Sequence, residues 1–283
     1  MPGNPARTSD RSDQLKVIFV TGSLFYNSRV VERVLQSMPG AVRAVIVGDF
    51  IYPKIGLFKS IVRVVQKAGW QYFLFKVFET LATQALVLLK GRKSRFHLID
   101  DMTRLYGVPV LYTKDLNAKR DVDFMRKFDP DVIVSMIPQK IGDEVMSLPK
   151  IGVINLHPGL LPEYRCFGGY FWPMVHDFGS YGYTIHFINE KIDAGDLILR
   201  EAFPITKEST AQNLYYYTLK HGAEGLLKVL ADFKAGRVER HPQDAEKFPL
   251  RPWPDSAGIK ELRKKGYALF RFKDLWNLYK NDL

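Results

Sequence analysis

Short apolar runs alternate with helical patterns along the first half of the chain. The runs are rich in β-branched residues and end in glycine or polar residues, which is typical of strands buried on both faces. This alternation predicts an α/β fold of Rossmann-like type, with a mostly parallel, twisted sheet flanked by helices. The predicted strands span residues 15–22, 41–48, 107–113, 131–137 and 151–157, with helical patterns at 28–35 and 121–128.

The second half of the chain predicts two more strands and then helices. Residues 183–190 and 196–205 have strand patterns, and a long helix follows over about 210–235. Ser209 is the predicted N-cap of that helix, and Gly236 is its predicted stop. The predicted organisation is a disordered tail at 1–13, a domain at 14–205 and a mainly helical C-terminal extension at 206–283.

Residues 50–96 form an unusual basic and aromatic helical insertion in this pattern. A stretch with little charge, 77–89, leads into a cluster of cations, but Lys76 and Glu79 interrupt the apolar run and argue against a transmembrane helix. A helix packed on the sheet is the favoured interpretation. The alternative is an amphipathic helix that makes peripheral contact with a membrane surface or a partner. The cations are Lys90, Arg92, Lys93 and Arg95.

Composition narrows the choice of partners and compartment. The chain has 41 Lys and Arg against 30 Asp and Glu, a formal charge of +11, which suits a nucleotide, a nucleic acid or an anionic membrane, or simply solubility. The single cysteine, Cys166, excludes a disulfide framework and a multi-cysteine zinc site within one chain, and no metal is predicted. The polar N-terminus lacks the apolar core of a signal peptide, so a cytoplasmic location is expected.

Candidate chemistry gathers where the fifth predicted strand ends. Asn155 and His157 are two residues apart, so strand geometry points both side chains to the same side of the sheet. Asp193 lies in a turn that follows the next predicted strand. Each residue alone is weak evidence, because single Asn and Asp residues are common in turns. Together they predict an acid–base cluster at the edge where α/β sheets bind their ligands.

Three motifs carry a resemblance to a known family. They are Asn-x-His-Pro-x-Leu-Leu-Pro at 155–162, Tyr-Arg at 164–165 and Asp-Ala-Gly-Asp-x-Ile at 193–198. This pattern resembles the formyltransferases that use 10-formyltetrahydrofolate, which include the glycinamide ribonucleotide, methionyl-tRNA and nucleotide-sugar amine enzymes. The likeness covers roughly residues 15–205 and is specific from about 131 to 204. It implies that 14–205 is a formyltransferase catalytic domain.

The resemblance implies catalytic roles for Asn155, His157 and Asp193. Asn155 and His157 would donate hydrogen bonds to the formyl oxygen as negative charge develops on it. Asp193 would relay a proton, through His157 or an ordered water. The nearby carboxylate is expected to favour the imidazolium form of His157.

The resemblance also implies where the co-substrate and the acceptor bind. The pterin of 10-formyltetrahydrofolate would lie between a loop after the fourth strand and the backbone that precedes Asp193. The loop residues are Pro138, Gln139, Lys140 and Ile141, and the opposite wall is Ile188, Asn189, Glu190, Lys191 and Ile192. Acceptor contacts are predicted for Tyr164, Arg165, Tyr170 and Trp172, which either stack on and pair with a nucleotide or phosphate or simply pack at the rim.

The sequence departs from the family pattern in places that affect the acceptor. Cys166 replaces the glycine that usually follows Tyr-Arg, so the close backbone approach made by that glycine must shift by two residues or be lost. The bulky residues 24–26 do not make the phosphate-binding turn of the glycinamide ribonucleotide enzymes. The residues after Pro204 predict helices, whereas the methionyl-tRNA enzymes have a β-barrel there.

These observations favour formyl transfer from 10-formyltetrahydrofolate to a primary amine of a small metabolite. A nucleotide-linked amino sugar or a natural-product intermediate is the expected acceptor, and nucleic acid is a less favoured partner. The alternatives are a 10-formyltetrahydrofolate hydrolase, a methionyl-tRNA formyltransferase-like enzyme and a membrane-associated folate-binding scaffold.

Overall fold

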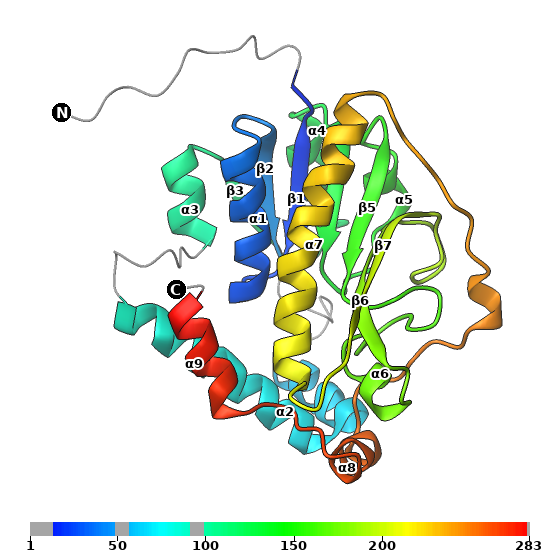
Figure 1. Ribbon diagram of the computed structural model, residues 1–283. Helices are drawn as coiled ribbons and strands as arrows, with labels where there is room; N and C mark the ends of the chain where they lie inside the picture. Colours follow the sequence, from blue (N-terminus) through cyan, green and yellow to red (C-terminus); the bar gives the residue numbers. More distant parts are fainter. Residues whose placement is uncertain (1–13, 49–56, 91–98, 282–283) are drawn as a thin grey trace.

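A seven-stranded sheet forms the centre of the computed structural model, which describes residues 14–48, 57–90 and 99–281 (Figure 1). The strand order is β3-β2-β1-β4-β5-β6-β7. The neighbours from β3 to β5 pair in parallel, while β6 runs antiparallel to both β5 and β7, so the predicted α/β fold with a mostly parallel sheet is confirmed. The strands are β1 (Val17–Thr21), β2 (Val42–Val47), β3 (Val110–Tyr112), β4 (Val132–Met136), β5 (Gly152–His157), β6 (Ser180–Phe187) and β7 (Leu197–Pro204).

Helices cover both faces of the sheet because successive strand residues alternate between two apolar cores. In β1, Val17 and Phe19 pack with α1 and α7, while Ile18 and Val20 pack with α4 and α5 on the other face. Burying a side chain such as Phe19 contributes about 2 kcal/mol. The helices of these layers are α1 (Phe25–Ser37), α3 (Ile99–Tyr106), α4 (Lys119–Arg126), α5 (Asp143–Met146) and α7 (Ala211–Lys234).

Helix α7 starts one residue later than the sequence predicts. Its N-cap is Thr210, whose Oγ1 accepts a hydrogen bond from the Asn213 amide at 3.1 Å, and Asn213 Oδ1 accepts one from the Thr210 amide at 2.9 Å. Ser209 instead accepts a bond from the Thr206 amide. The predicted N-cap was therefore wrong, because Asn213 selects Thr210 by completing a capping box. Gly236 has a φ of 73° just past the helix, as expected of a stop.

Helix α2 (Leu57–Lys90) confirms a helix within the predicted insertion, but it does not pack on a face of the sheet. It lies across the lower end of the molecule, where the parallel strands finish (Figure 1), and bends at Gly69. Ala68, Tyr72 and Phe75 are buried there among C-terminal helices and the connection that follows β5. The favoured interpretation from sequence, a helix packed on the sheet, was therefore wrong. The neighbouring elements are α6 (Trp172–Val175), the 3₁₀ turn Ala245–Lys247, α8 (Ser256–Lys264) and α9 (Phe272–Asn281).

Parts of two sequence predictions lie outside the described residues, namely the tail at 1–13 and the ends of the insertion at 50–56 and 91–96. Within the described ranges, no helix is both long enough and apolar enough to cross a membrane.

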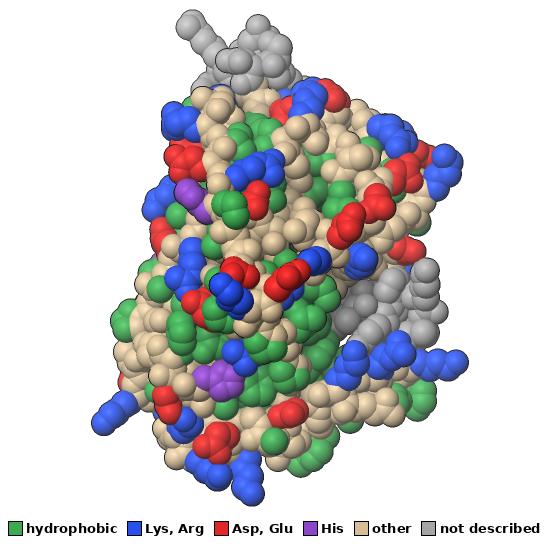
Figure 2. Space-filling model, turned by 90° about the vertical axis from the view of Figure 1, so that its right-hand side faces the viewer, with side chains coloured by type: hydrophobic (Ala, Val, Ile, Leu, Met, Phe, Trp, Pro, Cys, Tyr) green, Lys and Arg blue, Asp and Glu red, His purple; other side chains and the backbone are tan. Residues whose placement is uncertain are grey.

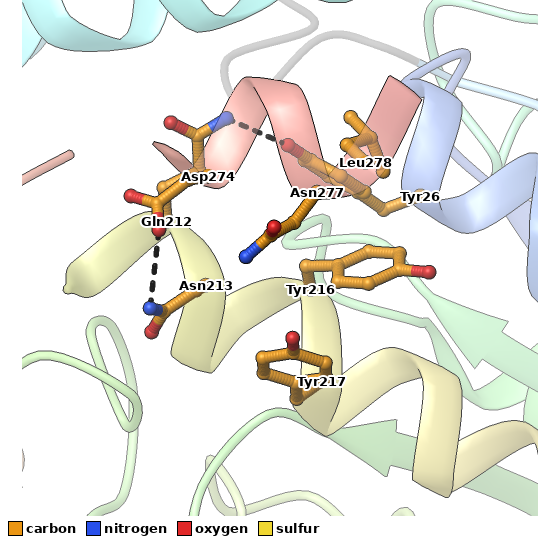
Figure 3. Close-up of a pocket in the computed structure, with 8 residues that line it drawn as sticks. All are labelled: Tyr26, Gln212, Asn213, Tyr216, Tyr217, Asp274, Asn277 and Leu278. Atoms are coloured by element: carbon orange, nitrogen blue, oxygen red, sulfur yellow. Dashed lines mark hydrogen bonds between the residues drawn. The ribbon is translucent and has the colours of Figure 1, made fainter. Parts of the chain in front are cut away.

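Helix α9 is attached to the start of α7 through one carboxylate. Asp274 Oδ2 accepts hydrogen bonds from Thr210 Oγ1 at 2.8 Å and from the Arg271 amide at 2.7 Å, while Oδ1 accepts from Asn213 Nδ2 at 3.2 Å. Figure 3 shows the cavity of about 20 Å³ that lies beside this junction. The buried Gln212 Oε1 has no hydrogen-bond partner among the described atoms, and the cavity has room for about one water.

Candidate active site

The carboxyl end of β5 carries Asn155 and His157 on one face, as their spacing predicts. The alternating residues of the strand, Ile154 and Leu156, point the other way into the core under α1 and α7. In the antiparallel register with β6, Asn155 lies opposite His186 and His157 lies opposite Thr184. The sheet therefore presents these polar side chains together at its carboxyl edge.

Asp193 meets both imidazoles from the loop after β6. Its Oδ2 lies 3.7 Å from His157 Nδ1, and its Oδ1 lies 3.6 Å from His186 Nε2. Oδ2 also accepts a hydrogen bond from the Cys166 amide at 2.7 Å. Burial alone would raise the pKa of Asp193, but attraction to the protonated forms of His157 and His186, together with the Cys166 amide, holds it well below its usual value. The carboxylate is therefore ionised at neutral pH.

His157 is held as a neutral imidazole. Its Nε2 lies 2.8 Å from the Tyr164 carbonyl oxygen, and because a carbonyl only accepts, Nε2 carries the proton. Burial lowers the pKa of His157, and His186 lowers it further, against the opposing effect of Asp193. Asp193 favours the imidazolium, as the sequence leads us to expect, but desolvation, which the sequence does not show, outweighs it. The Nδ1 lone pair faces Asp193.

His186 is a fourth member of the site that sequence reasoning missed. Its Nδ1 donates to the Phe187 carbonyl at 2.8 Å, so its Nε2 accepts from Asn155 Nδ2 at 3.2 Å. This contact fixes the Asn155 amide and uses only one of its two N–H groups. The strand pattern of residues 183–190 includes His186, but only the register with β5 brings His186 beside Asn155.

Two glycines bring the backbone segments around His157 into direct contact. A Cβ on Gly169 would lie 2.5 Å from the Pro158 carbonyl oxygen and 2.6 Å from Gly159 Cα. Gly169 therefore allows the close backbone approach that Cys166 cannot make. It lies three residues after Cys166, rather than two as expected. Cys166 itself adopts a φ of 76°, in the left-handed region that favours glycine. Burial raises the pKa of its thiol, so the thiol is not activated.

The two predicted folate walls each contribute a residue to one apolar cluster. Gln139 fastens the 138–141 loop, because its Oε1 accepts from the Leu116 amide at 2.7 Å and its Nε2 donates to the Lys114 carbonyl at 3.1 Å. Ile188, on the opposite wall, packs in the same apolar cluster as Ile141. Pro138 and Lys140 are exposed, as are Asn189, Glu190, Lys191 and Ile192. Their contact with a pterin stays a prediction.

The predicted acceptor residues are buried. Tyr164, Arg165, Tyr170 and Trp172 are 2%, 8%, 6% and 7% exposed. Arg165 donates to the backbone carbonyls of Ile192 at 2.6 Å and Ala245 at 2.7 Å, and Trp172 donates to the Pro252 carbonyl at 2.9 Å. These contacts favour the packing interpretation, since the rings offer little surface for stacking. Arg165 instead positions Ile192, the residue before Asp193.

A larger cavity, of about 450 Å³, opens at the carboxyl ends of β2 and β3. Its size is that of a ligand pocket, but Asp121 in its wall is already paired with Arg120, whose Nε lies 2.6 Å away, and with the Thr113 hydroxyl. Among the described residues, no group of three or more His, Cys, Asp and Glu side chains could hold a metal ion. The cavity lining is Val47, Tyr112, Thr113, Lys114, Asp115, Ala118, Arg120 and Asp121.

The fold and the polar cluster agree with the family that the sequence matches. Residues 90–230 match the family model described as formyl transferase. The chain belongs to the formyltransferase family through this region, which contains Asn155, His157, His186 and Asp193.

Curated relatives match this same part of the chain. A methionyl-tRNA formyltransferase from Listeria monocytogenes is 33% identical over 142 residues, which are 50% of this chain and 46% of that protein. The bifunctional polymyxin resistance protein ArnA from Wigglesworthia glossinidia brevipalpis is 33% identical over 182 residues, covering 59% of this chain and 27% of that protein. The chain thus spans less than half the length of either relative.

Solved structures share the fold over more of the chain. A sugar N-formyltransferase from a Shewanella species has a TM-score of 0.53 at 15% identity, covering 87% of this chain and 78% of its own. A phosphoribosylglycinamide formyltransferase from Anaplasma phagocytophilum has a TM-score of 0.56 at 15% identity, with 80% and 90% covered. An N-formyltransferase from Helicobacter canadensis, in complex with folinic acid and dTDP-3-aminofucose, has a TM-score of 0.51 at 17% identity, with 84% and 71% covered.

Proposed function

We propose that this protein transfers a formyl group from 10-formyltetrahydrofolate to a primary amine of a small metabolite. The proposal is carried by the convergence of Asn155, His157 and Asp193 at the carboxyl edge of the sheet. The folate donor is supported by the folinic acid bound to the Helicobacter enzyme. The same complex, with its amino-sugar nucleotide, supports a nucleotide-linked amino sugar as the acceptor class, beside natural-product amines.

Asn155 supplies the group that stabilises the transition state. The acceptor nitrogen attacks the formyl carbon, a C–N bond forms, and negative charge develops on the formyl oxygen. The Asn155 N–H that His186 does not use donates to this oxygen. Removing one such donor typically lowers the rate by ~10²–10³.

His157 and Asp193 move the proton that the attacking amine loses. The neutral His157 accepts it at Nδ1, because Nε2 already carries a proton that is donated to Tyr164. The ionised Asp193 stabilises the imidazolium formed in this step. The proton then passes to the departing folate nitrogen as its bond to the formyl carbon breaks, which regenerates neutral His157.

The test is incubation with 10-formyltetrahydrofolate and a panel of amines, followed by mass spectrometry of the amines and an assay of released tetrahydrofolate. The panel contains amino-sugar nucleotides, unlinked amino sugars, amino acids and methionyl-tRNA. We expect formylation of a small amine with release of one tetrahydrofolate for each product. Formate release without any amine would establish the hydrolase instead, and formylated methionyl-tRNA alone would establish the tRNA activity.

A further inference from the structure

One side of α2 is both exposed and apolar. Beyond the bend at Gly69, the exposed positions recur at helical spacing, and most of them hold large apolar side chains. The exceptions are Gln84 and Ala85, which are exposed in the turn between Leu81 and Leu88. A helix on a protein surface normally presents polar residues to water. The exposed fractions are 60% for Trp70, 50% for Leu74, 38% for Val77, 60% for Leu81 and 80% for Leu88.

Two charged residues of this half of α2, Lys76 and Glu79, lie on its inner side. Lys76 and Glu79 form an ion pair, with side chains 27% and 4% exposed. Burial acts to lower the pKa of Lys76, but Glu79 and nearby tyrosines raise it above the usual value, so Lys76 remains charged. Placing an ion pair inside and leucines outside is unfavourable in water alone. The helix therefore has the polarity expected if its outer face contacts an apolar medium.

Helix α9 extends the apolar surface of α2. Phe272 and Trp276 are 79% and 56% exposed. The Phe272 ring lies 5.9 Å from Phe270, whose ring is 4.6 Å from Phe78 of α2, so aromatic contacts connect the two helices. Figure 1 shows α9 alongside α2 at the same end of the molecule. We call this surface the α2–α9 face, made of Trp70, Leu74, Val77, Leu81, Leu88, Phe272 and Trp276.

Cations border the α2–α9 face on both helices. The first half of α2 exposes Lys59, Arg63 and Lys67, next to Phe58 and Val62. On α9, Lys273 is exposed and lies 3.6 Å from Glu208, and Lys280 Nζ lies 5.0 Å from the Trp276 ring. Figure 2 shows another side of the molecule, turned by 90° from Figure 1, on which acidic and basic residues are mixed.

We propose that the α2–α9 face docks on the surface of an anionic phospholipid membrane. The apolar side chains enter the boundary between headgroups and acyl chains, and the bordering Lys and Arg residues contact lipid phosphates and carboxylates. Trp70 and Trp276 suit this boundary because an indole ring has an apolar body and a polar N–H.

Charge favours a membrane over a second copy of the chain. Each chain has a formal charge of +11, and the cations border the apolar surface itself, so two copies would bring like charges together. An anionic lipid surface instead attracts each exposed cation. The strand ends that carry Asn155 and His157 lie at the same end of the molecule as α2 (Figure 1), so docking holds the catalytic edge toward the headgroups.

The test is flotation of the full chain with vesicles of phosphatidylcholine and phosphatidylserine, with pure phosphatidylcholine vesicles in parallel. We expect binding to the anionic vesicles that weakens as salt is added. The double variant Leu74→Glu/Leu81→Glu should bind roughly 100-fold more weakly, about tenfold for each leucine. Leu250→Glu is the matched control, since Leu250 is 47% exposed and lies outside the α2–α9 face. It should bind like the unmodified chain.

Two results would overturn the proposal. One is equal vesicle binding by the unmodified chain and the double variant, or no binding by either. The other is a dimer of the unmodified chain that dissociates in the double variant, which would assign the face to self-association. Circular dichroism checks the fold of each variant. Independently of any variant, brominated acyl chains should quench the tryptophan fluorescence of the unmodified chain, and unchanged emission contradicts the proposal. None of these measurements depends on formyl transfer.

Discussion

Gly169→Ala should disturb the active site through the backbone alone. The added Cβ would lie 2.5 Å from the Pro158 carbonyl oxygen and 2.6 Å from Gly159 Cα, whereas ordinary contact begins at 3.4 Å. Both neighbours are backbone atoms, so neither can move away by changing a rotamer. Overpacking of this kind costs about 1–3 kcal/mol, which lowers the melting temperature by roughly 4–8 °C at 2 kcal/mol for a chain of this size.

The same substitution should lower activity, because Gly159 lies against the imidazole of His157, to which the proposed mechanism gives the proton transfer. A Cβ at Gly159 would lie 2.8 Å from His157 Nε2, so a displaced Gly159 presses on that ring. A misplacement of about 1 Å typically costs on the order of 10²-fold in rate. The assays are thermal unfolding and release of tetrahydrofolate at saturating amine.

Gly107→Ala is a control for a glycine-to-alanine change without a steric clash. Gly107 has a positive φ, of 66°, and no described atom lies within 4 Å of its Cβ position. Its replacement should cost about 1 kcal/mol and leave the rate unchanged. If Gly169→Ala has the same melting temperature and the same rate as Gly107→Ala, the contact between Gly169 and Gly159 does not hold His157 in place.

Three further predictions test separate parts of the structure. Gln139→Ala removes two bonds that fasten the 138–141 loop, so the KM for the folate donor should rise about tenfold with kcat unchanged; an equal fall in kcat would contradict a binding role. Asp274→Ala removes three accepted hydrogen bonds, and urea unfolding should show a loss of about 1–3 kcal/mol; unchanged stability would show that α9 is held otherwise. Because the pKa of His157 is lowered in the folded state, its contribution to stability is complete above its ordinary pKa of 6.5 and is lost as the pH falls toward the folded value. The unfolding free energy should therefore drop less between about pH 7 and pH 5 in His157→Gln than in the unmodified chain.

The sheet was predictable because strand periodicity is local. Each apolar run, such as 131–137, carries its own signal, and alternation with helices then implies parallel pairing. The position of α2 was not predictable in the same way. Periodicity shows that Trp70, Leu74 and Leu81 share a side of a helix, but it does not show whether that side faces a core or solvent.

The candidate site was predictable to the extent that spacing determines it. Asn155 and His157 share a face because they are two residues apart in a strand, and the Asp193 turn follows the next strand. His186 joins them only through the register between β5 and β6, which residue spacing does not provide. The charge of His157 depends on its burial at 3% exposure, which is a property of the tertiary structure.

The measurement that tests the proposed chemistry most directly is the single-turnover rate of tetrahydrofolate release for Asn155→Ala against the unmodified chain. Both should be assayed with the amine that the unmodified chain formylates, after their melting temperatures are shown to agree. The oxyanion role of Asn155 predicts a rate lower by ~10²–10³ with little change in donor affinity. An unchanged rate in Asn155→Ala would contradict formyl transfer at this cluster.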